Sequence, residues 1–334
     1  MAGFLVKFFT LRAGIVASAL VALLYSGATS AELPRLSVAH KFAQNHPVHQ
    51  ALERFRENLA GVVSVEVNAP RNERETVQGM ISGASDATVI SSAVFQQTVS
   101  ELGMLDLIGL WRDRAHWARA LDGEAGREFS ALVGRAKSGA GFQVLGYWGG
   151  TQRYILTRRD GVPKIEDLNG LRLQILFNPV RSKMWKALGV QPVLPTQPDL
   201  SAMLRAGTVD GIEEEAEVIV QTRLFEVASH LTETGHAIAT RLFIIAKPAW
   251  QKLTPPQQAA LTAAAQKAAA VARAGELERE TTALTSLKER FGVRLHSFTG
   301  QEALVSRTRP FRARYAEEMS ISRLFTLIEK TAKP

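Results

Sequence analysis

The chain has 334 residues, of which 46% are hydrophobic and 22% charged, a composition typical of a globular protein with room for two domains. It contains no cysteine, which excludes disulfides, thiolate catalysis, iron–sulfur clusters and cysteine-ligated zinc. The formal net charge is +8, but the basic residues are scattered along the sequence and form no cluster, so a nucleic-acid partner is not expected.

The first 31 residues have the pattern of a secretory signal peptide. Lys7 and Arg12 precede an apolar run from Ala13 to Leu24, and the small residues that end at Ala31 suit a signal peptidase. A membrane anchor is the alternative, but the run is shorter than the roughly 20 residues that a bilayer requires. We therefore expect residues 1–31 to be removed, the mature chain to be exported, and no direct membrane insertion afterwards.

In the mature chain, short apolar or β-branched runs alternate with amphipathic stretches, which predicts an α/β fold with parallel strands. The predicted strands cover residues 36–40, 63–69, 87–91, 143–147, 153–157, 172–176 and 242–246. The predicted helices cover residues 47–59, 117–121, 180–188 and 200–206. Ligands in open α/β sheets bind beyond the carboxyl ends of the strands, so each step from strand to helix is a candidate ligand position.

A long helix is predicted from Pro255 to Arg290. Thr254 can cap its first turn, Gln257 can reach back to complete a capping box, and Gly292 follows the end as a stop. At 1.5 Å per residue the helix is about 54 Å long, more than one compact lobe can cover, so it is expected to span two. A coiled coil is the alternative, but the alanine-rich stretch 263–271 gives a poor seam.

No familiar catalytic motif is present in the sequence, and no cofactor, metal or enzymatic activity is expected. His40, His46 and His49 are close in sequence, but no acidic partner lies beside them, so capping or surface roles are favoured over metal binding. The acidic run 213–215 with Glu217 suggests a calcium site. On an extended segment, however, adjacent carboxylates point to opposite faces, which favours a solvent-exposed run.

Several segments are more specific when they are taken together. They are ISGASD (81–86), His116-Trp117, Arg153, PKIEDLNGLR (163–172), Ala187-Leu188-Gly189, AGTVDG (206–211), Thr234-Gly235-His236 and KPAWQKL (247–253). In this combination the mature chain resembles, over almost its whole length, the solute-binding proteins of TRAP transporters (tripartite ATP-independent periplasmic transporters).

The resemblance implies a two-lobed α/β periplasmic solute-binding fold whose lobes close over a small ligand, with a long helix spanning both lobes. Lobe I is expected to comprise residues 32–150 and about 239–279, and lobe II residues 151–238 and about 280–334. The family's usual ligands are organic acids, which are delivered to TRAP transporter membrane subunits without any reaction. A ligand-sensing protein that docks on a sensor kinase or chemoreceptor is the alternative, and the sequence does not separate the two.

Members of that family hold the ligand carboxylate with an arginine on the strand after the Asp-Leu-x-Gly turn. Another arginine ahead of that turn and an asparagine after the Val-Asp-Gly turn assist it. In this sequence Arg153 occupies the leading position, but the principal position falls on Gln174 and the asparagine position on Glu214. The two departures remove one positive charge and add one negative charge.

A carboxylate would be repelled from such a site. Losing one partner of a buried charge pair costs roughly 2–5 kcal/mol, so an acid bound in the usual way would weaken by about one and a half to nearly four decades. A neutral, polyhydroxylated or amine-bearing ligand suits Gln174 and Glu214 better. The alternative is a conventional organic-acid binder in which Arg153 pairs internally with Glu214 while Arg181 or Arg172 reaches the acid.

Other candidate ligand-binding residues rest on position alone. His46 lies at a step from strand to helix, although helix capping explains it equally well. Glu73 lies in a charged segment that matches a family loop, and a solvent-exposed charge is its alternative. Ser91 and Ser92 end a strand and can donate hydroxyl groups. Three aromatic residues could stack on a ring, although core positions explain them as well: Trp148, Phe177 and Trp185.

Overall fold

The computed structural model describes residues 32–68, 72–136, 141–175, 178–194 and 200–332. The predicted signal peptide and Phe177 lie outside these residues. The chain divides after Pro34, and every element described below belongs to the part from Arg35 to Pro334. Among the described helices, none is both long enough and apolar enough to cross a membrane.

A mixed sheet organises the chain, in the order β2-β1-β3-β9-β4-β7-β5-β6. Strand β1 is parallel to β2 and β3, and β5 is parallel to β6 and β7, as the alternating pattern predicts. The antiparallel strands β9 and β4 join these two parallel groups. The bounds are β1 (Arg35–Ala39), β2 (Ser64–Val67), β3 (Ala87–Ser91), β4 (Phe142–Thr157), β5 (Arg172–Gln174), β6 (Gln191–Val193), β7 (Gly211–Glu215) and β9 (Ile238–Ala246).

The prediction of two separate strands at 143–147 and 153–157 was wrong, because both belong to the 16-residue strand β4. Its first part pairs with β9, and its last residues pair with β7 and β8 (His230–Glu233), which in turn pairs with β10 (Arg294–Ser297). Gly149 and Gly150 have φ angles of 104° and 109° at a register shift. A Cβ at Gly149 would collide with the backbone of Ala239. In the sequence the two glycines suggest the end of a strand, but in the structure they allow β4 and β9 to pair closely.

Most other predicted elements are confirmed within a few residues. The strands at 36–40, 63–69, 87–91, 172–176 and 242–246 correspond to β1, β2, β3, β5 and β9, although Ala69 and Leu176 lie outside the described residues. The helices at 47–59, 117–121, 180–188 and 200–206 correspond to α2 (Pro47–Asn58), α5 (Arg114–Asp122), α7 (Pro179–Ala187) and α8 (Leu200–Ala206). The sequence pattern missed β6, β7, β8 and β10, which are short and depend on partners distant in the chain.

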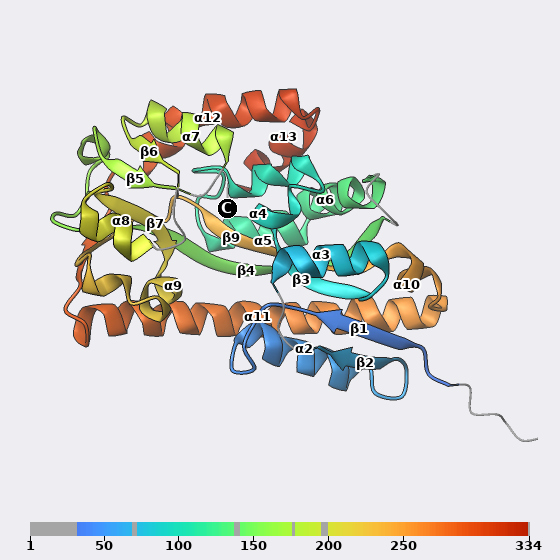
Figure 1. Ribbon diagram of the computed structural model, residues 1–334. Helices are drawn as coiled ribbons and strands as arrows, with labels where there is room; N and C mark the ends of the chain where they lie inside the picture. Colours follow the sequence, from blue (N-terminus) through green and yellow to red (C-terminus); the bar gives the residue numbers. More distant parts are fainter. Residues whose placement is uncertain (1–31, 69–71, 137–140, 176–177, 195–199, 333–334) are drawn as a thin grey trace, which may run out of the picture. The chain divides into compact units, whose positions relative to one another are not determined.

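The long helix α11 (Pro255–Glu289) confirms the prediction to within its last residue. The capping box between Thr254 and Gln257 is present, and α11 packs against α2, β4 and α9 (Ala216–Gln221; Figure 1). Its buried residues are mainly alanines, which allow close approach to these neighbours. A Cβ at Gly275 would lie 2.7 Å from Cβ of Pro47, which explains a glycine in the middle of the helix.

The remaining helices complete the layers on either side of the sheet (Figure 1). They are α3 (Glu73–Ser82), α4 (Ser92–Phe95), α6 (Glu124–Arg135), α10 (Lys247–Gln251), α12 (Gln301–Glu318) and α13 (Ser322–Thr331), with short 3₁₀ turns at η1 (Ser100–Asp106), η2 (Ile165–Leu168) and η3 (Leu224–Glu226). Trp148 and Trp185 are fully buried in hydrophobic core clusters. Trp148 packs edge-on against Phe243, and Trp185 packs edge-on against His236.

Candidate functional site

The candidate site is a cavity of about 320 Å³ at the carboxyl ends of β3 and β7, beside β4 and the start of β9. Ligands of α/β proteins bind at this edge of a sheet. Five residues predicted from the sequence line it: Glu73, Ser91, Ser92, Arg153 and Glu214. The other lining residues are Lys41, Ala93, Val94, Asp106, Glu215, Val218, Ala237, Ile238, Ala239, Thr240 and Arg241.

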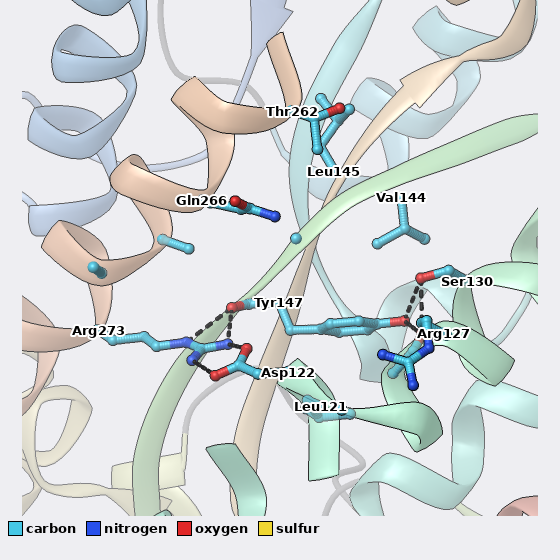
Figure 2. Close-up of a pocket in the computed structure, with 15 residues that line it drawn as sticks. Leu121, Asp122, Arg127, Ser130, Val144, Leu145, Tyr147, Thr262, Gln266 and Arg273 are labelled. Carbon is cyan, nitrogen blue, oxygen red and sulfur yellow. Dashed lines mark hydrogen bonds and ion pairs between the residues drawn. The ribbon is translucent and has the colours of Figure 1, made fainter. Parts of the chain in front are cut away.

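Two larger hollows, of about 450 and 580 Å³, lie elsewhere. In the first, Arg273 of α11 binds both carboxylate oxygens of Asp122 at 2.7 and 2.8 Å and the backbone oxygen of Tyr147, while the Tyr147 hydroxyl meets Ser130 (Figure 2). In this first hollow the polar groups of the lining residues therefore already bind one another. The second hollow is lined by Arg172 and Asp210 among others. Because the five predicted residues converge only on the smaller cavity, that cavity is the better candidate.

One wall of the cavity is organised around Glu73, the first residue of α3. Its carboxylate accepts hydrogen bonds from the Ser91 backbone amide at 2.9 Å and the Ser91 hydroxyl at 2.8 Å, and lies 3.3 Å from Nζ of Lys41. Charge-assisted hydrogen bonds of this kind are strong. They fix the carboxylate at the end of β3, with the Lys41 ammonium at its side.

A second wall joins Ser92 and Asp106. The Ser92 hydroxyl lies 3.0 Å from Oδ1 of Asp106 and 3.0 Å from the backbone oxygen of Thr240. Burial raises the pKa of Asp106 to about 6, so this carboxyl gains protons more easily than an exposed aspartate does. The backbone oxygen of Asp106 also accepts a hydrogen bond from Arg181, which ties η1 to α7.

Arg153 lies at the centre of the charged side of the cavity. Its Nη2 is 3.0 Å from Oε1 of Glu214 and donates to the backbone oxygen of Glu213 at 2.8 Å, and its Nη1 is 3.8 Å from Oε1 of Glu215. Burial opposes the positive charge, but the carboxylates of Glu214, Glu213 and Glu215 raise the pKa of Arg153. The guanidinium is therefore already compensated by the protein itself.

Arg241 is a cavity residue that sequence reasoning missed. It lies in β9, where it binds Glu276 of α11, and its Nη2 is 3.7 Å from Oε2 of Glu215. Its guanidinium also lies over the Phe42 ring, 5.4 Å from the centroid. A single charged residue within a strand that is otherwise uncharged and mainly apolar, Ile238–Ala246, was the signal that could have identified it.

Gln174 and Arg181 bind groups of the protein itself, and Arg181 reaches the backbone oxygen of the cavity-lining Asp106. Gln174 is buried and donates to the backbone oxygen of Ile175 at 2.8 Å. Arg181 is 1% exposed and donates to the carboxylate of Glu213, which also lies 2.8 Å from Nε2 of His236. Among the residues that line the cavity, neither of these two is found.

The histidines near the N-terminus have local partners. His46 caps α2 by accepting from the amide of Val48 at 3.1 Å, and burial lowers its pKa to about 3. Nδ1 of His49 lies 3.1 Å from Nε2 of His40. Among the described residues, no group of three His, Cys, Asp or Glu is arranged to hold a metal ion.

The expectation of a solvent-exposed acidic run at 213–215 was wrong. Glu213 is 1% exposed and bound to Arg181 and His236, while Glu214 and Glu215 face Arg153 and Arg241. The segment is the end of β7, an interior strand of the sheet, so its carboxylates are enclosed between neighbours. Arginine partners from other strands and helices compensate these charges, which a linear sequence does not indicate.

The cavity therefore combines cations and acids in near balance. Among the described residues, its lining includes three cationic side chains, Lys41, Arg153 and Arg241, and four acidic ones. Each cation already lies beside a carboxylate of the chain. A mixed α/β fold with a polar cavity at the strand ends is suited to binding a small polar molecule.

Comparison with known proteins identifies the family. The model of the bacterial extracellular solute-binding protein, family 7, matches residues 38–318, and the chain belongs to this family of receptors, which are not enzymes. A solute-binding protein of Verminephrobacter eiseniae is 31% identical over 216 residues, which cover 65% of this chain and 63% of that relative's length.

Solved structures confirm the fold expected from the resemblance. A TRAP periplasmic solute-binding protein from Ochrobactrum anthropi, with its C-terminus bound in the ligand-binding pocket, gives a TM-score of 0.80 at 24% identity and covers 89% of this chain and 95% of its own. Another from Bradyrhizobium sp. BTAi1, in complex with α/β-D-galacturonate, gives 0.75 at 25% identity and covers 90% and 100%. The expected membership among TRAP solute-binding proteins is thereby confirmed.

Proposed function

We propose that this chain is the periplasmic receptor of a TRAP-type secondary transporter, with residues 1–31 serving for export. Its ligand is a small polar molecule that presents hydroxyl or ammonium groups, and no carboxylate, to Arg153 and Glu214. Residues 32–150 with about 239–279 form one lobe and residues 151–238 with about 280–334 the other. The ligand contacts both lobes and thereby favours the closed state, which is presented to the membrane subunits.

The observation that carries the ligand proposal is the ion pair between Arg153 and Glu214 inside the cavity. A ligand carboxylate would have to displace a carboxylate that is covalently part of the chain. Truncating one partner of a buried charge pair costs roughly 2–5 kcal/mol, which corresponds to about one and a half to nearly four decades in affinity. A hydroxyl group can donate to Glu214 without breaking the pair, and an ammonium adds a favourable charge.

The related receptor bound to galacturonate supports a sugar-like shape for the ligand. A uronate carries ring hydroxyls as well as a carboxylate, and a cavity of about 320 Å³ accommodates a molecule of that size. Glu73, Ser91 and Ser92 supply further hydrogen-bonding groups for hydroxyls at the opposite wall. Gln174, at the principal family position, is included in this proposal as a ligand-binding residue, and Phe177, outside the described residues, stays a sequence-based candidate for stacking on a ring.

Three matched sugars test the proposal by isothermal titration: D-galactose, D-galactosamine and D-galacturonate. All three share the galactose-type ring; D-galactosamine has an amine in place of the 2-hydroxyl of D-galactose, and D-galacturonate has a carboxylate in place of its C6 hydroxymethyl. We expect D-galacturonate to bind at least about 30-fold more weakly than the better of the other two. Native mass spectrometry of freshly purified protein complements this test by weighing any ligand that copurifies.

Two variants complete the design. Gln174→Ala removes the residue at the principal family position, and Gln191→Ala, at the exposed first residue of β6, is the control. Tight binding of D-galacturonate or a simple keto acid by the wild type that survives Gln174→Ala contradicts the proposed ligand class. The family membership does not depend on that outcome.

A further inference from the structure

Glu215 lies between two arginines of the cavity. It is the last residue of β7, and its carboxylate is 3.8 Å from Nη1 of Arg153 through Oε1 and 3.7 Å from Nη2 of Arg241 through Oε2. The Thr151 hydroxyl donates to the same Oε2. One internal carboxylate thus bridges guanidinium groups from β4 and β9.

The Glu215 side chain carries its charge at neutral pH. Burial disfavours the ionised form, but Arg241, Arg153 and the Thr151 hydroxyl together lower the pKa of Glu215 below its usual range. Two guanidinium groups and a hydroxyl donor are also the groups that a cavity offers to a bound carboxylic acid. Glu215 therefore occupies, as part of the chain, a position suited to an anionic ligand.

The neighbouring acids do not have the same geometry. Glu214 pairs with Arg153, and its Oε1 also accepts from the backbone amide of Glu215 at 2.9 Å, but among the described residues the ion pairs of Arg241 are with Glu215 and Glu276. Glu276 binds Arg241 from α11 and is not among the cavity-lining residues that the structure describes. Of these three acids, Glu215 alone contacts both guanidinium groups.

We infer that Glu215 determines the ligand class by excluding carboxylates from the position between Arg153 and Arg241. This inference rests on the proposed function and adds the residue responsible for it. The side chain is tethered, so it competes at a high effective concentration with any free acid. Like charges brought together in the cavity add to that penalty.

The substitution Glu215→Gln tests this role, because the amide has nearly the same shape and can still accept from Thr151. Titration of wild type and variant with D-galacturonate at neutral pH should give at least about a tenfold higher affinity for the variant. The affinity for D-galactose should change by less than about threefold. A gain of affinity is a result that loss of structure does not produce.

Glu217→Gln is the matched control. Glu217 follows on α9 and binds Arg279 at the side chain, and it is absent from the described cavity lining. The Glu217→Gln variant removes the same charge at nearly the same place in the chain. Because Glu217 does not line the described part of the cavity, this variant should not gain affinity for D-galacturonate. Should Glu215→Gln fail to unfold cooperatively, Glu215→Ala removes the same charge and leaves space, and the same comparison applies.

The outcomes separate the two hypotheses. If the wild type rejects D-galacturonate and the Glu215 variants reject it as strongly, this inference is overturned while the proposed ligand class stands. An equal gain in Glu217→Gln also overturns it, because a general charge effect would then suffice. If the wild type itself binds D-galacturonate more tightly than the neutral and amine sugars, the proposed ligand class fails and the inference fails with it.

Discussion

Replacing Arg181 with methionine tests whether this arginine compensates a buried charge or binds ligand. The Arg181 guanidinium donates to Glu213 and to the backbone oxygen of Asp106, and both charged side chains are almost completely enclosed. Without it, the Glu213 carboxylate loses its ion pair with Arg181 and keeps its contact with His236. Breaking a buried ion pair by removing one partner costs about 3–5 kcal/mol.

That loss is large enough to measure in two ways. Urea titration should show the reduced free energy of unfolding directly. With an unfolding entropy of about 2.1 cal/mol/K per residue over roughly 300 residues, the same loss lowers Tm by about 5–8 °C. Adding Glu213→Gln to Arg181→Met should recover much of the stability, because the buried charge is removed as well.

Arg172→Met is the matched control. Arg172 binds Asp210 at 2.6 Å, but both side chains are about two-fifths exposed, at 42% and 39%. Solvent screens exposed ion pairs and side-chain ordering opposes them, so this variant should be nearly as stable as the wild type. Equal stability losses for Arg172→Met and Arg181→Met would refute the reasoning, because burial would then not decide the contribution.

The pH dependence gives an independent check with a defined sign. Burial opposes the charge of Glu213, but Arg181 and His236 lower its pKa below the usual range. The ionised carboxylate therefore stabilises the wild type above the unfolded pKa of about 4.3, and this contribution is lost as the pH falls through the lower folded pKa. The stability deficit of Arg181→Met should accordingly shrink on acidification.

Three further predictions concern single positions. Thr254→Ala removes the side-chain cap of α11 and should lower the free energy of unfolding by about 1 kcal/mol, and an unchanged urea midpoint would contradict a role for the cap. Gly126→Ala places a Cβ against the backbone oxygen of Leu121 and should destabilise by about 1–3 kcal/mol or more, whereas an unchanged Tm would mean that the turn relaxes freely. Burial raises the pKa of Glu276 from 4.5 to about 7, so this carboxyl keeps its proton to a higher pH in the folded protein than in the unfolded chain. The wild type therefore loses stability as the pH rises between those two values. Glu276→Gln should remove about 3 kcal/mol of that decline, measured as the difference between the two stability–pH profiles, and parallel profiles would contradict the assignment.

Local sequence signals predicted five helices correctly because their causes lie within one or two turns, although the sequence analysis did not name the other helices, α3, α4, α6, α9, α10, α12 and α13. The cap at Thr254 and the uninterrupted pattern that follows defined α11 to within one residue. The same locality explains the failure at β4, where a Gly-Gly pair suggested a break. Whether a glycine pair ends a strand or permits close pairing depends on the neighbouring strand, and β9 lies nearly a hundred residues away.

Part of the candidate site was also predictable. Glu73, Ser91, Ser92, Arg153 and Glu214 were singled out by strand ends or by family position, and the structure brings all five to one cavity. Whether they bind a ligand stays a prediction. Gln174, Trp148 and His46 were chosen by the same reasoning, yet side-chain orientation takes the first two into the interior and the third to a helix cap.

The sequence by itself determined the family, the α/β pattern, the long capped helix and the unusual acids after the Val209-Asp210-Gly211 turn. Only the tertiary structure decided what those acids do. The register of β4 against β7 places Arg153 opposite Glu215, and β9 adds Arg241 from the other side. Charges interact through space over a few ångströms, so their partners are set by strand pairing and not by distance along the chain.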